Sequence, residues 1–226
     1  MTTTKIEIQS THPIGREKCR LQAVLFDLGR VLVHYDHQQT VMAIATLAQI
    51  PVDAGHQLVH AHSHALGVGD LAAEDFHALF CTHFGVTVAF EAFIAAFATG
   101  IHRDESALAY ALSLQNRPEV TVAVISNTNA AHVLWLDEHL PELRAFDLVM
   151  MSNEVGLIKP DPAIFETALD LLDVAPSQAI FIDDIAENVA AARVLGMAGI
   201  VHTDWNETRP QLEAWLATGE DQGKAL

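Results

Sequence analysis

The stretch Leu21-Gln22-Ala23-Val24-Leu25-Phe26-Asp27-Leu28-Gly29 decides the fold of this chain. A short apolar run ends in a carboxylate and a glycine, which is typical of a buried strand that leads into a tight loop. Four similar apolar runs follow, at 120–125, 146–151, 179–182 and 199–202. Runs that are apolar on both strand faces are typical of a parallel sheet covered by helices on each side.

Helical patterns separate most of these runs, at 130–140, 162–172 and 187–195. This alternation predicts an α/β fold with a doubly wound, Rossmann-like parallel sheet. About ninety residues lie between the first two strands, which is far more than one crossover helix needs. They contain four further helical patterns, at 38–50, 53–65, 72–83 and 90–99. The sequence therefore predicts a small helical cap domain inserted after the first strand.

These patterns divide the chain into three parts. Residues 1–20 show neither the helical nor the strand period and are predicted to be an N-terminal extension. Residues 21–35 and 103–226 are predicted to form the α/β core domain. Residues 36–102 are predicted to form the helical cap domain.

The composition excludes several classes of partner. Lys and Arg number 12 against 29 Asp and Glu, a formal net charge of −17, which argues against nucleic acid. Two cysteines, Cys19 and Cys81, are too few for a disulfide framework. The sequence has neither an apolar run of about 20 residues nor a signal-peptide pattern. We therefore expect a cytoplasmic protein with no membrane partner, either a monomer or a homodimer.

Polar residues follow the predicted strands at the points where they end. Asp27, Ser126 and the pair Asp183-Asp184 come directly after three of the apolar runs or close them. In doubly wound sheets the carboxyl ends of the strands line one crevice, so these side chains are expected to meet there. With Lys159 as a cation, they are the groups that phosphoryl transfer through an aspartyl-phosphate needs.

From Leu21 to Leu216 the sequence resembles the haloacid dehalogenase superfamily of hydrolases. Four motifs carry the resemblance in the order of the family, at residues 26–32, 125–129, 156–162 and 181–188. The insertion after the first motif resembles the helical cap of the family's first subclass. This resemblance implies a phosphatase, with Asp27 as the nucleophile and with Ser126, Asn127 and Lys159 binding the phosphoryl oxygens.

The same resemblance implies a magnesium site. Asp27, the backbone carbonyl of Gly29 and Asp184 are the implied ligands, while Asp183 orients a metal-bound water. Mg²⁺ prefers oxygen ligands and retains several waters, which suits this set. The cation would offset the repulsion between an anionic Asp27 and an anionic phosphate.

The sequence departs from the family pattern at Gly29. Most phosphatases of the superfamily carry there a second aspartate that protonates the leaving group, a contribution of roughly 10²–10⁴ in rate. A sugar 1-phosphate has a more acidic leaving oxygen and needs less help. The stretch from Val124 to Ile200 is similar to bacterial α-D-glucose-1-phosphate phosphatases, so small sugar phosphates are the expected substrates. The neighbouring Arg30 is predicted either to contact substrate or to pair with an acid of the cap.

The charge of the cap agrees with a small substrate. No Lys or Arg occurs from Val31 to His102, whereas six Asp and Glu do. A cap of this composition offers no permanent positive charge to a second phosphate, which favours a singly phosphorylated metabolite.

Two other functions stay open. A 2-haloacid dehalogenase also lacks the second aspartate, but it uses no metal, and the pair Asp183-Asp184 suits a cation better than a halide. A weakly active phosphate-binding regulatory protein is the other alternative, and Gly29 is its support.

Several histidines have competing interpretations. His56, His60 and His64 share one helix face at a spacing that can bind metal, although a solvated surface is the favoured interpretation. His34 and His37 follow the first motif and are candidates for the missing acid, or simply line the cap hinge.

Overall fold

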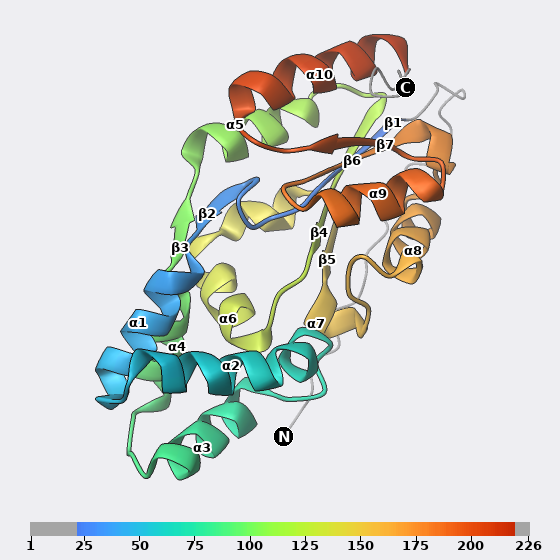
Figure 1. Ribbon diagram of the computed structural model, residues 1–226. Coiled ribbons are helices and arrows are strands. Elements are labelled where there is room, and N and C mark those ends of the chain that lie inside the picture. Colours follow the sequence, from blue (N-terminus) through green and yellow to red (C-terminus); the bar gives the residue numbers. More distant parts are fainter. Residues whose placement is uncertain (1–21, 220–226) are drawn as a thin grey trace.

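The computed structural model describes residues 22–219, and its centre is a five-stranded parallel sheet (Figure 1). The strands are β1 (Gln22–Phe26), β4 (Val120–Ser126), β5 (Leu148–Met151), β6 (Ala179–Asp183) and β7 (Ala198–Val201). Their order across the sheet is β5-β4-β1-β6-β7, and every neighbouring pair is parallel. The predicted fold class is confirmed. The predicted N-terminal extension lies outside the described residues.

Helices cover both faces of the sheet. In β1, Val24 and Phe26 point into a core shared with α5 (Glu105–Leu114) and α10 (Trp205–Thr218). Ala23 and Leu25 point the other way, into a core shared with α8 (Pro162–Leu172) and α9 (Ala186–Val194). This alternation explains why the strand is apolar along its whole length.

Local signals fix where the helices start and stop. The side chain of Asp161 accepts a hydrogen bond from the backbone of Ala163, and Pro162 occupies the first turn of α8. The helix ends where Asp173 adopts a left-handed conformation with φ of 53°. The helix therefore begins three residues after Lys159, at Pro162.

Four helices make up the cap: α1 (His37–Ala48), α2 (Val52–Gly67), α3 (Ala73–Phe84) and α4 (Phe90–Ala98). They enclose a core of their own in which aromatic rings meet: Phe76, Phe80, Phe93 and Phe97. In Figure 1 these helices lie beyond the carboxyl ends of the strands, beside α6 (Ala130–His139) and α7 (Ser152–Val155). All four cap helices were predicted, and their bounds differ from the expected ranges by a few residues at most.

A short antiparallel ribbon joins cap and core, and the sequence does not predict it. It consists of β2 (Val33–Tyr35) and β3 (Ile101–Arg103). Just beyond it, Asp36 N donates to Gly100 O at 2.9 Å. A Cβ atom on Gly100 would lie 2.1 Å from the carbonyl oxygen of Asp36, so this close approach requires glycine.

The remaining elements are the short 3₁₀ helices η1 (Pro141–Ala145) and η2 (Pro176–Gln178). The sequence also leaves α5, α7 and α10 unpredicted, and it starts β5 two residues early. Within residues 22–219, no helix combines the length and the apolar character that a membrane crossing demands.

Candidate active site

The three central strands deliver acidic and hydroxyl groups to one edge of the sheet. Asp27 follows β1, Ser126 ends β4 and Asp183 ends β6, and β1 lies between the other two. The amide of Asp27 donates to Ile182 O at 2.8 Å, which continues the sheet pairing up to the site. The predicted convergence of these side chains is therefore what the structure shows.

Lys159 is the centre of the cluster. Its ammonium group donates to Asp27 Oδ1 at 2.6 Å, to Asp183 Oδ2 at 2.7 Å and to the backbone oxygen of Ile125 at 2.9 Å. The lysine side chain is 1% exposed, so water does not screen these contacts. A buried cation thus joins two carboxylates from different strands.

Asn127 holds Lys159 in place. Its side-chain amide donates to Lys159 O, its side-chain oxygen accepts from Lys159 N, and both distances are 2.8 Å. Sequence reasoning placed Asn127 on the phosphate itself. In the structure its side chain pairs with a loop 32 residues further along the chain, a partnership for which the sequence carries no signal.

Three carboxylates form a candidate cation site. Oxygen atoms of Asp27, Asp183 and Asp184 lie within 4.8 Å of one another. The buried Asp183 also accepts hydrogen bonds from Asn188 Nδ2 at 3.0 Å and from the amide of Ile185 at 2.8 Å. Asp184 accepts none of these bonds, and its side chain is 17% exposed. Hard carboxylate oxygens fit Mg²⁺, with Asp184 better placed than Asp183 to bind it directly.

Arg30 lies at the same cluster. Its guanidinium Nη1 is 3.2 Å from Asp184 Oδ2, and its side chain is 67% exposed. Arg30 adopts a left-handed backbone conformation with φ of 62°, which is uncommon for a residue other than glycine, Asn or Asp. The partner of Arg30 is thus Asp184, an acid of the core, rather than an acid of the cap.

Burial raises the pKa of Asp27 to about 6. The attraction of Lys159 opposes this rise, and the neighbouring negative charge of Asp183 adds to it. Lys159 therefore stabilises the ionised form of Asp27, which burial disfavours.

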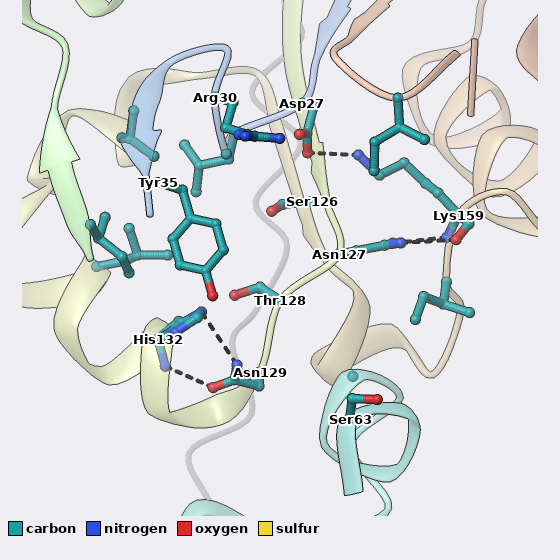
Figure 2. Close-up of a pocket in the computed structure, with 18 of the residues that line it drawn as sticks. Asp27, Arg30, Tyr35, Ser63, Ser126, Asn127, Thr128, Asn129, His132 and Lys159 are labelled. Atoms are coloured by element: carbon teal, nitrogen blue, oxygen red, sulfur yellow. Dashed lines mark hydrogen bonds and ion pairs between the residues drawn. The ribbon is translucent and has the colours of Figure 1, made fainter. Parts of the chain in front are cut away.

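A cavity of about 390 Å³ adjoins these residues (Figure 2). Asp27, Gly29, Ser126, Lys159 and Asp184 line it at the sheet edge, as do Arg30 and Asn127. All predicted site residues except the buried Asp183 therefore border one space.

The structure does not bring the candidate histidines to this cavity. His34 lies 3.6 Å from Asp104 Oδ2 with its side chain 69% exposed, and neither His34 nor His37 is among the lining residues. His56 and His60 have ring centroids 6.0 Å apart. In the part of the chain that the structure describes, no group of three ligand atoms gathers around these histidines as it does around Asp27.

Comparison with known proteins gives the family of the chain. A family model described as haloacid dehalogenase-like hydrolase matches residues 21–196. The D-ribitol-5-phosphate phosphatase of Bacteroides thetaiotaomicron is 27% identical over 185 residues, covering 78% of this chain and 89% of that enzyme. Bifunctional epoxide hydrolase 2 of rat is 37% identical over 73 residues, which are 32% of this chain and only 13% of the rat protein.

A solved structure shares the fold. A haloacid dehalogenase-family enzyme of Bacteroides thetaiotaomicron, crystallised with magnesium and inorganic phosphate, superposes with a TM-score of 0.73 at 21% sequence identity. The superposition covers 83% of this chain and 98% of that one. Sheet, flanking helices and cap are thus an arrangement that this chain shares with a known enzyme.

Proposed function

The chain belongs to the haloacid dehalogenase-like hydrolases, and from this premise we propose that it is a Mg²⁺-dependent phosphatase acting on small phosphomonoesters. One observation carries the proposal: Lys159 Nζ lies within 2.7 Å of both Asp27 and Asp183, next to the partly exposed carboxylate of Asp184. A nucleophile, a fixed cation and metal-binding oxygens are together the requirements of phosphoryl transfer.

In the proposed reaction, a carboxylate oxygen of Asp27 attacks phosphorus and forms an aspartyl-phosphate. The bond from phosphorus to the alcohol oxygen breaks, and that oxygen takes up a proton as the alcohol leaves. Water then attacks the aspartyl-phosphate, releases inorganic phosphate and restores Asp27. Lys159 and the hydroxyl of Ser126 bind phosphoryl oxygens during both steps, with Asn127 keeping the lysine in position.

Asp27, Asp184 and the backbone carbonyl of Gly29 are the proposed Mg²⁺ ligands. When bound, the cation supplies positive charge that reduces the repulsion between the phosphate and the carboxylates. Asp183 serves as a positioning residue, because its oxygens already accept bonds from Lys159, Asn188 and Ile185.

Sugar phosphates are the substrates that the sequence predicts. The argument depends on Gly29, since an acidic leaving oxygen compensates for a missing proton donor. Similarity to a D-ribitol-5-phosphate phosphatase supports a small phosphorylated metabolite in general. A cytoplasmic location and a monomer or homodimer remain predictions from the sequence.

The two alternatives predict different chemistry. In a dehalogenase the departing halide would leave beside Asp183 and Asp184, which repel an anion. A regulator that binds phosphate without turnover is favoured by Gly29 alone, and it requires the same Lys159 cluster.

Phosphate release from a panel of esters tests the proposal. The panel contains sugar phosphates, nucleotides and an aryl phosphate, each with Mg²⁺ and with a chelator. We expect release that depends on Mg²⁺ and that the Asp27→Asn variant lacks. Absence of release from every ester, with inorganic phosphate still binding, would leave the regulator as the better description. Release that is equal with Mg²⁺ and with chelator would contradict the metal assignment.

A further inference from the structure

The cavity at the sheet edge has two chemically different ends. The end near Asp27 carries the charged groups described above. The far end lies beside His132 of α6 and Ser63 of α2 (Figure 2), and residues of α4 and β3 also line the cavity. A volume of about 390 Å³ is in the range of pockets that enclose a small ligand. A phosphoryl group at the charged end therefore leaves space for the alcohol at the far end.

Apolar side chains form most of the far wall. They come from both the cap and the core: Val59, Leu66, Phe97, Ile101, Leu136 and Ile158. Leu66, Phe97 and Leu136 line the cavity and are otherwise covered, since each is only 2–3% exposed. An alcohol lying here contacts hydrocarbon on several sides.

Ser63, Asn129 and His132 on the far wall each have at least one hydrogen-bond partner within the protein. Ser63 Oγ donates to His60 O at 2.8 Å. Asn129 Oδ1 accepts from the amide of His132 at 3.0 Å, and Asn129 Nδ2 lies 3.3 Å from His132 Nδ1. The other ring nitrogen, His132 Nε2, lies 3.2 Å from the backbone oxygen of Phe97. Of the polar groups labelled in Figure 2, the hydroxyls of Tyr35 and Thr128 lie between the two ends.

The far end also lacks cationic side chains among the residues described as lining the cavity there. The cap sequence from Val31 to His102 holds no Lys or Arg. Burial lowers the pKa of His132 to about 4, so this imidazole is neutral near pH 7. A second phosphate or a carboxylate on the alcohol finds no cationic partner on this wall.

We propose that the far end binds a hydrocarbon group, so that the substrate is a phosphomonoester whose alcohol carries an apolar group. This inference rests on the proposed function and differs from it in the alcohol, for which the sequence predicts a sugar. Sugar hydroxyls buried against Val59, Leu66 and Phe97 would lose their hydrogen bonds to water without replacement. Methylene groups in the same place gain affinity from leaving water.

Binding of alkylphosphonates tests the inference without relying on turnover. Methyl-, butyl- and hexylphosphonate are titrated into the full chain with Mg²⁺ by calorimetry, beside the phosphonate analogue of glucose 1-phosphate. We expect affinity to rise by up to about fourfold for each methylene that enters the cavity. The sugar analogue is expected to bind no more tightly than methylphosphonate.

Two matched variants locate the effect on α2. Val59→Thr replaces one methyl group of the far wall with a hydroxyl at almost constant volume, whereas Val52→Thr does the same at the 44% exposed start of the helix. Hexylphosphonate should bind several-fold more weakly to Val59→Thr, with methylphosphonate unaffected and Val52→Thr unchanged. Thermal unfolding identifies a variant that has lost its fold. In that case the series of alkylphosphonates binding to the wild type still tests whether the far end binds a hydrocarbon group.

The outcomes separate the two proposals. Chain-length-dependent binding without phosphate release from any ester would contradict the phosphatase and leave the hydrocarbon site standing. Phosphate release with equal binding of all phosphonates, or with the sugar analogue bound most tightly, would overturn the hydrocarbon site and leave the phosphatase.

Discussion

The guanidinium of Arg30 lies 3.2 Å from Asp184, one of the proposed Mg²⁺ ligands. A permanent cation at this distance neutralises part of the charge that attracts Mg²⁺. Since Arg30 is largely exposed, the pair is expected to be worth only about 0.2–1 kcal/mol.

Replacing Arg30 should therefore strengthen metal activation. In Arg30→Gln, we expect the Mg²⁺ concentration for half-maximal phosphate release to fall roughly two- to fivefold, in line with an exposed pair. The control Arg30→Lys keeps the charge and should stay close to the wild type. A higher metal requirement in Arg30→Gln would instead indicate that the arginine helps to assemble the site.

Asp27→Asn should abolish turnover and leave the fold intact. The variant loses the nucleophile, for which a drop of three or more orders of magnitude in kcat is expected. Lys159 keeps its contact with Asp183 at 2.7 Å, so the cluster retains a paired charge. The exposed Asp173→Asn at the end of α8 is the matched control. Steady-state kinetics with circular dichroism checks both points, and wild-type turnover in Asp27→Asn would reject the covalent scheme.

Lys159→Met should destabilise the protein, most strongly without metal. The substitution leaves Asp27 and Asp183 buried without their cation, a change that typically costs about 3–5 kcal/mol. Added Mg²⁺ should restore part of the loss. Urea unfolding in chelator and in Mg²⁺ measures the free energy lost without and with the metal. As a control, adding Asp27→Asn to Lys159→Met removes one unpaired carboxylate and should recover stability. A loss below about 0.5 kcal/mol would mean that the buried pair is not maintained in solution.

Gly29→Asp should favour substrates with poor leaving groups. A Cβ atom on Gly29 would meet nothing closer than Tyr35 Cβ at 4.0 Å, so the backbone there has room for the first atom of a side chain. A proton donor here is expected to raise kcat on alkyl phosphates by about 10² or more, with little change for an aryl phosphate. Gly29→Asn has the same size but no acid and serves as the control. Equal effects of the two substitutions would show that the gain does not come from proton transfer.

The contribution of His132 to the free energy of unfolding should fall between about pH 6.5 and pH 4, a window in which Asp27, with its pKa raised to about 6, acts in the opposite direction. The pKa of His132 is lowered to about 4 in the folded protein from 6.5, so within this range the unfolded chain binds the additional proton. The contribution of the neutral His132 to the free energy of unfolding is complete above pH 6.5 and is lost as the pH falls towards 4. Because the ring borders the cavity and is not fully enclosed, we expect a loss of about 1–3 kcal/mol.

Urea unfolding at several pH values measures this slope. Between pH 6.5 and pH 4, His132→Asn should lose about 1–3 kcal/mol less stability than the wild type, while the exposed His64→Asn controls for replacing a histidine. An unchanged slope in His132→Asn would assign the pH dependence to other groups.

The sheet and the charged end of the site were predictable because their signals are local. An apolar run followed by Asp27, or by Asp183-Asp184, identifies both the strand and the group at its end. The ribbon of β2 and β3 was not predictable, since three residues per strand are too few to show a period of two.

Other features depend on partners that are distant in sequence. Nothing local distinguishes an Asn127 that binds phosphate from one that binds the Lys159 backbone. The far wall was missed for a similar reason. Val59 and Phe97 fit the apolar period of a packed helix, and that period is the same whether the side chain faces a core or a ligand.

The hydrogen bond between Asp36 and Gly100 brings the entrance and the exit of the cap to a single point. An insertion whose two ends touch can be exchanged for another without moving the strands that carry Asp27 and Asp183. The cap between positions 36 and 100 can therefore be replaced by another domain in evolution or by engineering. The residues that act on the phosphate would stay in place, while the specificity for the alcohol would change.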